Sequence, residues 1–552
     1  MKGLKRALVF ILIAACLVTA LQGCSTQMTG TGGAGTGTTD SAGAKTTDSS
    51  GTAVSSGAVG AESSPQAGYW PEENWRIALP EEQGMDSSKL LKLIEYIEDT
   101  NTQIHSLIII RNGYMVLDAD FFPYKSDVKH IINSCTKSIT SALFGIADDE
   151  GLIRGTGQKA MDYFTDRAVQ NADDRKKELT LDNLLTMTAG FEWSEDGSYG
   201  STDSWMQMIG SGDPLQYILD RPMAETPGTS FYYNTGATHL LSAVLQKATG
   251  QKAGDYAREK LFKPLGIRDV TWQEDVNGLN IGGSGIYMSP RDMARFGYLF
   301  LRNGLWNGSQ VVPESWVKDA VRKHVDTPNG LAGHYGYGYQ WWMNSFGGYS
   351  ARGYGGQYIF VLPEYDIVAV FTGALIGSEF FLPERLMEGY VVPACTKPEA
   401  ADAGAQARLL DKLEKISGPS EATKIAVLPP IAEDISGKTI ELDNRDELCL
   451  SFPKDHEDTA EFRHGPSNGI SVGLDNVFRI SDAGKYWPLP DHNMVAAKGG
   501  WDDEKTFKIT MVSLHEMDLL TYTISFDNND VNAELWSQQG GEIFNAKGRL
   551  KR

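Results

Sequence analysis

Cysteine, histidine and positive charge are all scarce in this chain. Its 552 residues include five cysteines and nine histidines, and none of them has the spacing of a zinc site. Five scattered cysteines do not make a disulfide scaffold. Acidic residues outnumber basic ones by 71 to 50, which gives a formal net charge of −21, and no basic cluster follows residue 6. Because a phosphate backbone would repel such a chain, we expect no nucleic-acid partner. We also expect no metal and no other cofactor.

The N-terminus has the pattern of a targeting segment. Three basic residues among the first six precede the apolar run 7–20, which is too short to span a bilayer comfortably but suits a signal peptide. The sequence Leu21-Gln22-Gly23-Cys24 then resembles a bacterial lipobox. This resemblance implies that Cys24 is lipidated and that the protein is anchored to the outer face of a bacterial cell membrane. The alternative is cleavage near residues 18–20 and a secreted protein.

Composition divides the chain into five segments. The second is made of Gly, Ser, Thr and Ala with almost no large apolar residue, so it has no means of forming a core. The fourth is rich in Ala, Lys, Glu and Pro. We predict a signal peptide (1–23), a disordered linker (24–68), a first domain (69–398), a second linker (399–430) and a C-terminal β domain (431–552).

Hydrophobic patterns predict an α+β fold for the first domain. Two strand-like apolar stretches, 104–110 and 114–121, flank Asn112-Gly113, which is typical of a β-hairpin. Helical patterns dominate from 179 to 324, and strand patterns then return between 337 and 372. An antiparallel sheet built from both ends of the domain, flanked by helices and interrupted by a helical subdomain, accounts for this order.

The last segment has a different pattern. From residue 435 to 550, short alternating stretches are separated by Asp, Asn and Gly turns, which predicts a small antiparallel barrel or sandwich. We find no catalytic constellation in it. Two cysteines, Cys395 and Cys449, leave open whether a disulfide joins it to the first domain.

A serine and a lysine stand at the start of an apolar, helix-like run. Ser134 precedes Lys137 by three residues, so on a helix their side chains share a face. The N-terminus of a helix also favours a developing alkoxide. Four Ser-x-x-Lys matches occur in the chain, and what distinguishes this one is the apolar stripe that follows it. We therefore predict a serine nucleophile with a lysine base, the chemistry of a hydrolase.

Such a site needs a second proton-handling group and an oxyanion hole. The segment 227–236 offers Tyr232 as a proton shuttle and Asn234 as a partner of Lys137 or of the substrate. The alternative for Asn234 is a helix N-cap. The segment 353–357 offers glycines, which let a backbone approach a ligand closely, followed by a strand edge with its N–H groups. Its alternative is a plain turn.

These motifs resemble the three active-site elements of the serine β-lactamase and penicillin-binding-protein-like family. They are Ser134-x-x-Lys137, Tyr232-x-Asn234 and Tyr354-Gly355-Gly356, in that order. The second element points to the class C β-lactamase and esterase branch. The form Gly-Tyr-Gly-Gly-Gln most resembles 6-aminohexanoate-dimer hydrolases and related esterases. The resemblance covers roughly residues 75–395 and includes the blocks 184–190, 261–267, 289–294 and 337–342.

The resemblance implies a role for each residue. Ser134 becomes acylated, Lys137 takes or relays its proton, and Tyr232 acts with Lys137 as general base and then as acid toward the leaving group. Asn234 orients Lys137 and the substrate. The backbone N–H groups of Ser134 and Gln357 form the oxyanion hole, with Gly356 beside them. The same tyrosine and lysine activate the water that removes the acyl group.

The third element departs from the family pattern. It often begins with Lys or His, which helps to bind a substrate carboxylate, whereas here the residue is Tyr354. A phenol is a much weaker partner for an anion at neutral pH. Arg352 lies two residues away, and we expect it to be a solvated surface residue. This departure makes β-lactams and D-alanyl-D-alanine peptides poorer candidate substrates than neutral esters or amides.

The sequence therefore predicts a serine hydrolase acting on small ester, amide or peptide-like substrates. The alternatives are a β-lactamase or D-alanyl-D-alanine carboxypeptidase, and a penicillin-binding sensor that turns over slowly. Because Ser134, Lys137 and Tyr232 are all intact, we favour an active enzyme.

Overall fold

A computed structural model describes residues 70–71, 74–195, 200–328, 334–396, 402–453, 458–465, 467–484 and 494–551. The expected signal peptide, the linker 24–68 and Cys24 lie outside the described residues. Across the described ranges, every helix is too short or too polar to cross a membrane.

The predicted β-hairpin forms one edge of a seven-stranded antiparallel sheet. Asn112 and Gly113, with φ values of 52° and 83°, make the two-residue turn that joins β1 to β2. β1 also pairs with β12 from the far end of the domain, so the sheet is built from both ends of the domain as predicted. The strand order is β2 (Tyr114–Asp120), β1 (Ile104–Arg111), β12 (Ile367–Gly373), β11 (Gln357–Leu362), β10 (Tyr349–Gly353), β9 (Trp342–Asn344) and β8 (His334–Tyr337).

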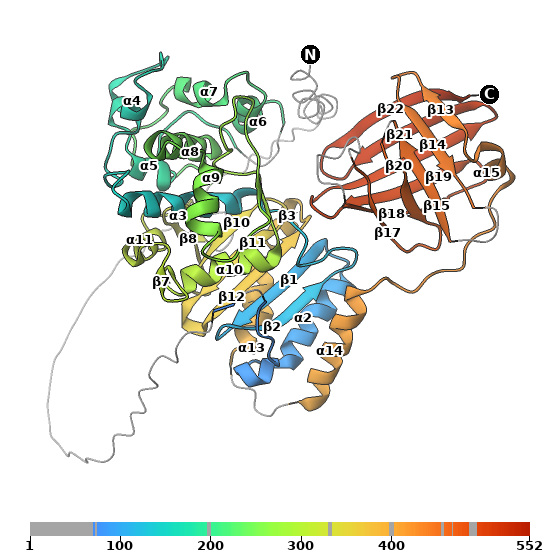
Figure 1. The fold of residues 1–552 in the computed structure, drawn as a ribbon, viewed down its shortest axis with the longest axis horizontal. Helices are drawn as coiled ribbons and strands as arrows, with labels where there is room; N and C mark the ends of the chain where they lie inside the picture. The colour runs from blue at the N-terminus through green and yellow to red at the C-terminus, as the bar shows by residue number, and fades with distance from the viewer. Residues whose placement is uncertain are drawn as a thin grey trace, which may run out of the picture. The chain divides into compact units, whose positions relative to one another are not determined.

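The central strands are buried on both faces. Because successive side chains of a strand point to opposite sides, Ile108 and Val370 enter one core while Leu107 and Phe371 enter another. The first core is shared with α3 and α10, and the second with α2 and α14, which run along β1 and β2 in Figure 1. These helices are α2 (Ser87–Asp99), α3 (Thr136–Asp149), α10 (Pro290–Leu301) and α14 (Ala403–Ser417).

α14 extends the first domain beyond the expected boundary at residue 398. Its Leu409 and Ile416 are buried in the core beneath α2 and the sheet. The segment 399–430 therefore contains a helix that belongs to the first domain. Residues 418–429, which include no helix or strand, make the connection to the next domain.

The helical subdomain lies between β2 and β8 in the chain. Ser289 caps α10 by accepting a hydrogen bond from the backbone N–H of Asp292, as its position before Pro290 predicts. The other elements of this region are β3 (His130–Ile131), α4 (Asp174–Glu178), α5 (Leu181–Leu185), α6 (Ser204–Ile209), α7 (Pro214–Asp220), α8 (Thr235–Thr249), α9 (Ala253–Ala257), β4 (Thr271–Trp272), β5 (Ile286–Met288), β6 (Leu305–Trp306), β7 (Ser309–Gln310) and α11 (Glu314–Ala320). β3, β5 and β4 form a small sheet of their own.

One predicted strand is interrupted. The strand pattern at 337–343 is broken by a tight turn at residues 338–341, where Gln340 has a φ of 66°. The turn follows from packing: the backbone N–H of Tyr339 donates to the carbonyl of Ala320 at the end of α11. A Cβ at Gly338 would lie 2.1 Å from that same carbonyl oxygen, so only glycine fits there. After β12 the chain forms α12 (Leu382–Leu386) and α13 (Val392–Ala394).

The C-terminal domain is a closed β-barrel, the first of the two predicted architectures (Figure 1). Nine strands follow one another in antiparallel pairs, and a parallel pairing of β16 with β18 closes the ring. Cys395 and Cys449 are free thiols, so no disulfide links this domain to the first. Its elements are α15 (Pro430–Ile435), β13 (Thr439–Leu442), β14 (Glu447–Ser451), β15 (Thr459–His464), β16 (Ile470–Gly473), β17 (Arg479–Asp482), β18 (Met494–Trp501), β19 (Thr506–Ser513), β20 (Leu519–Asp527), β21 (Asp530–Ser537) and β22 (Gly541–Leu550).

Candidate active site

Ser134 lies in a single 3₁₀ turn, Asn133–Cys135, that leads directly into α3. Asn133 has a φ of 45°, a strained conformation for a residue other than glycine, and it turns the chain sharply out of β3. α3 is buried along almost its whole length, as its apolar stripe predicts. The serine therefore sits where a rigid helix begins.

Lys137 is buried and all three of its N–H bonds have acceptors. Its Nζ lies 3.0 Å from the Oγ of Ser134, 2.9 Å from the Oγ1 of Thr235 and 2.9 Å from the carbonyl oxygen of Gly283. These acceptors come from three separate segments of the chain. A buried ammonium group is costly unless it is fully hydrogen-bonded, and here it is.

Burial also determines the acidity of this lysine. Loss of solvation lowers the pKa of Lys137 to about 8, and the negative charge of Glu195 works in the opposite direction. At pH 7 roughly one molecule in ten then carries a neutral Lys137 amine, which is the form that accepts a proton.

The structure places Tyr233, rather than the expected Tyr232, beside Ser134 and Lys137. The side chain of Tyr232 is 51% exposed. The side chain of Ser134 is near enough to lower the pKa of Tyr233, and the ring of Tyr233 lies 4.8 Å from the Nζ of Lys137. Its ring also stacks on the buried Trp342. Burial raises the pKa of Tyr233 well above the usual value for tyrosine, so its hydroxyl stays protonated.

The contact with Lys137 that was expected of Asn234 is made by the next residue, Thr235. The Oδ1 of Asn234 accepts a hydrogen bond from the backbone N–H of Ala237, which makes Asn234 the N-cap of α8 and corrects the expectation that it orients Lys137. Thr235 is the residue that accepts from Lys137. Its own hydroxyl donates to Oε1 of Glu195 over 2.5 Å, and its backbone N–H donates to Oε2 over 2.8 Å.

The glycine turn of the third element lies against the nucleophile turn. The side-chain amide of Asn133 donates to the carbonyl oxygen of Tyr354 over 2.8 Å. The thiol of Cys135 donates to the carbonyl oxygen of Gln357, the first residue of β11. Gly355 and Gly356 have φ values of 84° and 86°, which side chains rarely adopt, so this turn depends on both glycines.

Arg352 is not a surface residue, which corrects the sequence expectation. It is 4% exposed, and its Nη1 pairs with the Oε1 of Glu384 at 2.9 Å. It also donates to Ser350 and Asn344 and lies against the ring of Trp342. Arg352 is thus committed to a buried network and does not restore the cation that the third element lacks.

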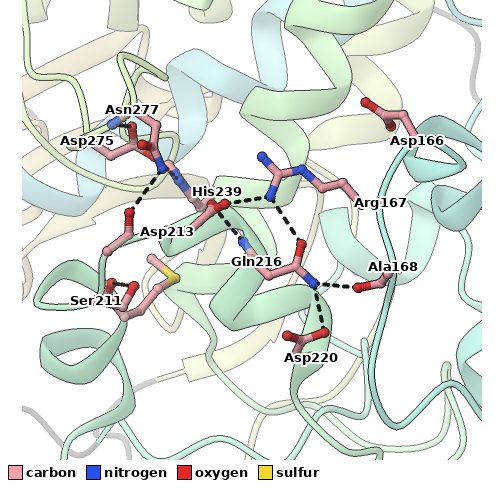
Figure 2. Close-up of polar contacts among 12 residues, drawn as sticks. Asp166, Arg167, Ala168, Ser211, Asp213, Gln216, Asp220, His239, Asp275 and Asn277 are labelled. Atoms are coloured by element: carbon pink, nitrogen blue, oxygen red, sulfur yellow. Dashed lines mark hydrogen bonds and ion pairs between the residues drawn. The ribbon is translucent and has the colours of Figure 1, made fainter.

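A histidine on α8 fixes the loop that holds Lys137. The Nε2 of His239 lies 3.1 Å from Oδ2 of Asp275, and both side chains are buried. Figure 2 shows this pair, with Asn277 beside Asp275. The pair ties the loop 273–285 to α8, and Gly283 of this loop supplies one of the acceptors for Lys137. His239 is therefore a packed histidine that acts by positioning.

Sequence reasoning missed Tyr233, Thr235, Glu195 and Gly283. One signal was available for the tyrosine: in an extended segment Phe231 and Tyr233 share a side, so a buried Phe231 places Tyr233 inward and Tyr232 outward. No comparable signal marks Glu195 or Gly283, because both reach Lys137 only through the tertiary fold. Among the described residues, no group of three or more His, Cys, Asp or Glu side chains forms a metal site.

Comparison with known proteins identifies the family. The family described as Beta-lactamase matches residues 94–374, about half of the chain. This chain therefore belongs to the beta-lactamase family, and it is a serine hydrolase of that family. It is 24% identical over 299 residues to a 6-aminohexanoate-dimer hydrolase from Paenarthrobacter ureafaciens, a match that covers 51% of this chain and 75% of that one.

Solved structures with a related fold are more distant in sequence. A penicillin-binding protein homologue from Caulobacter crescentus is 16% identical, with a TM-score of 0.46 over 58% of this chain and 99% of that one. An octameric penicillin-binding protein homologue from Pyrococcus abyssi is 14% identical, with a TM-score of 0.43 over 83% of this chain and 99% of that one.

The electrostatics of the site can be tested at Glu195. We expect Glu195→Gln to lower the pKa of Lys137 below about 8, because the carboxylate favours the ammonium form and an amide does not. The ε-carbon NMR shift of Lys137, assigned with Lys137→Arg, would follow the titration directly. Glu192→Gln is the matched control, since Glu192 pairs with Arg221 at the surface and has no contact with Lys137. An unchanged Lys137 titration in Glu195→Gln would contradict this account.

Proposed function

We propose that this enzyme hydrolyses small esters or amides through an acyl-enzyme on Ser134. The observation that carries the proposal is the cluster of three groups around Lys137: its Nζ lies 3.0 Å from the Oγ of Ser134 and 4.8 Å from the centre of the Tyr233 ring. A nucleophile, a base that titrates near neutral pH and a proton donor are thereby held together.

The two pKa shifts suit Lys137 and Tyr233 to different roles in proton transfer. Lys137 is the general base, because its neutral amine is accessible near pH 8 and can accept the proton of Ser134. Tyr233 remains a phenol and is therefore the general acid. As the bond to the leaving group breaks, Tyr233 gives that group its proton, and the ammonium of Lys137 then returns one to Tyr233. In deacylation a water molecule attacks the acyl carbon and gives a proton to Lys137. Tyr233 protonates the oxygen of Ser134 as its bond to the acyl group breaks, and the ammonium of Lys137 returns a proton to Tyr233.

The oxyanion that forms on the acyl carbonyl needs donors. We propose the backbone N–H groups of Ser134 and Gln357 for this role. The position of Gln357 supports it: the thiol of Cys135, next to the nucleophile, lies 3.3 Å from the Gln357 carbonyl oxygen. The N-terminal end of α3 adds a favourable partial positive charge.

The charges around the third element favour uncharged substrates. Tyr354 replaces the family's cation, and Arg352, the nearest arginine in the sequence, already pairs with Glu384. A substrate carboxylate would therefore find no strong partner on this side. We propose neutral esters or amides as substrates. A β-lactamase or carboxypeptidase activity would need a cation from elsewhere.

The nucleophile can be tested by covalent labelling. We expect Ser134→Ala to abolish labelling by a fluorophosphonate and by activated esters, as read by intact mass spectrometry. Ser141→Ala is a control, because Ser141 is a fully buried serine of α3 whose hydroxyl has no hydrogen-bond partner among the described residues. Labelling that persists in Ser134→Ala would place the nucleophile elsewhere. A long-lived penicilloyl adduct on Ser134 would instead favour a penicillin-binding protein or sensor.

The general acid can be tested with two neighbouring tyrosines. We expect Tyr233→Phe to lower kcat for anilide hydrolysis by about 10²- to 10⁴-fold, the usual contribution of general acid–base catalysis, because an anilide leaving group needs a proton whereas p-nitrophenolate does not. Tyr232→Phe should change kcat little, because the Tyr232 side chain is exposed. The reverse ranking of the two variants would restore Tyr232 as the catalytic tyrosine.

We also propose that the enzyme is lipid-anchored outside the cytoplasm through Cys24. The support is the basic start, the short apolar run and the sequence Leu-Gln-Gly-Cys. Expressed in a bacterium, Cys24→Ser should lose the diacylglyceryl mass and move from the membrane fraction to the soluble fraction, whereas Cys16→Ser within the signal segment should not. A wild-type N-terminus starting near residue 21 without lipid would show ordinary signal cleavage.

A further inference from the structure

The C-terminal barrel reaches the active site through one loop. The loop joins β19 to β20, and we call residues 514–518 the β19–β20 loop. The backbone N–H of Ile131, in the strand just before the nucleophile, donates to the carbonyl oxygen of His515 over 2.8 Å. The Nδ1 of His515 in turn lies 2.7 Å from the carbonyl oxygen of Lys129. The loop is therefore bonded to β3 on both sides of His130.

A side-chain contact and an apolar cluster secure the same loop. The hydroxyl of Tyr287, on β5, donates to Oε1 of Glu516 over 2.5 Å. On the barrel side, Asp518 accepts from the hydroxyl of Ser537 over 2.6 Å. Leu514 is buried with Val512 in a small hydrophobic cluster that also includes side chains of the first domain. These first-domain members are Tyr124 and Val128. The loop is thus anchored to both domains.

Met517, at the tip of this loop, touches two of the three active-site elements. The amide of Asn133, one residue before the nucleophile, lies 3.3 Å from the Met517 sulfur. On the third element, a Cβ at Gly355 would come within 2.4 Å of that sulfur. The Met517 side chain is partly exposed, so it faces open space as well as these two turns.

We propose that Met517 of the C-terminal barrel forms the wall of the acyl-binding side of the active site and limits the size of the acyl group. This inference rests on the proposed acyl-enzyme. The leaving group must face Tyr233, which protonates it, whereas Met517 packs on Asn133 and Gly355 at the turn that leads into Gln357. The substituent that meets Met517 is therefore the acyl chain. A flexible thioether suits this place, because it contacts apolar groups of different shapes.

The test uses the full-length protein and p-nitrophenyl esters of increasing acyl length, from acetate to octanoate. We expect Met517→Ala to raise the octanoate-to-acetate ratio of kcat/KM by about tenfold, since a few methylene groups in an apolar pocket discriminate by that order. Met517→Leu, which keeps the volume, should keep the wild-type ratio. Ile480→Ala removes an exposed apolar side chain elsewhere in the barrel and should also leave the ratio unchanged.

The outcomes separate this inference from the proposed function. Wild-type turnover with the same acyl-length ratio in Met517→Ala would overturn the wall and leave the acyl-enzyme intact. Absence of ester turnover and of Ser134 labelling in the wild type would overturn the proposed function itself. A ratio that changes equally in Ile480→Ala would show a general effect of the barrel rather than a contact by Met517. Thermal unfolding of each variant would confirm that the folded proteins are being compared.

Discussion

The site depends on a buried cation whose three acceptors, one local and two from distant segments, must be in place together. The ammonium of Lys137 donates to a serine on its own helix turn, to a threonine at the start of α8 and to the carbonyl of Gly283 in the loop before β5. Removing any acceptor would leave a buried charge without its full set of hydrogen bonds, which is far more costly than losing a surface contact. Neighbouring side chains hold two of these acceptors in place. Glu195 orients the threonine, and the His239–Asp275 pair holds the loop that carries Gly283.

The same burial also lowers the pKa of Lys137 toward neutral pH. In water a lysine is almost wholly protonated at pH 7 and is a poor base. Desolvation lowers its pKa, but desolvation alone would also make the folded state less stable, and Glu195 moderates both effects by favouring the ammonium form. For Tyr233 burial acts in the opposite sense, because the charged form of a phenol is the anion. One buried environment thus shifts the pKa of a lysine down and that of a tyrosine up, and the proposed mechanism uses the first as a base and the second as an acid.

Much of the fold follows from local patterns, whereas the details of the site do not. The Asn112-Gly113 hairpin, the cap at Ser289 and the alternating strands of the barrel are short-range signals, and each is found where the sequence predicts it. The broken strand at 338–341 is different, since it results from the backbone meeting the end of α11. The choice between Tyr232 and Tyr233 is also tertiary. A motif with one free position fits Tyr232 and Asn234, and only packing shows that Asn234 is a cap and that Tyr233 and Thr235 face the lysine.

Segments far apart in the chain meet near the site, and this explains why the three sequence motifs do not predict substrate specificity. The three family elements lie within about 225 residues of one another, between Ser134 and Gln357, and they define the reacting groups. The β19–β20 loop belongs to a domain outside the matched region 94–374, yet its backbone bonds to β3 and its methionine contacts the nucleophile turn. A barrel that merely followed the hydrolase as a separate module would have no reason to share a hydrophobic cluster with Tyr124 and Val128. Since that cluster buries apolar surface from both domains, separating them would expose it to water, and the loop would then no longer be held against Asn133. If Met517 lines the acyl side as proposed, the shape of that side is a property of both domains, while the proposed reacting groups all belong to the first.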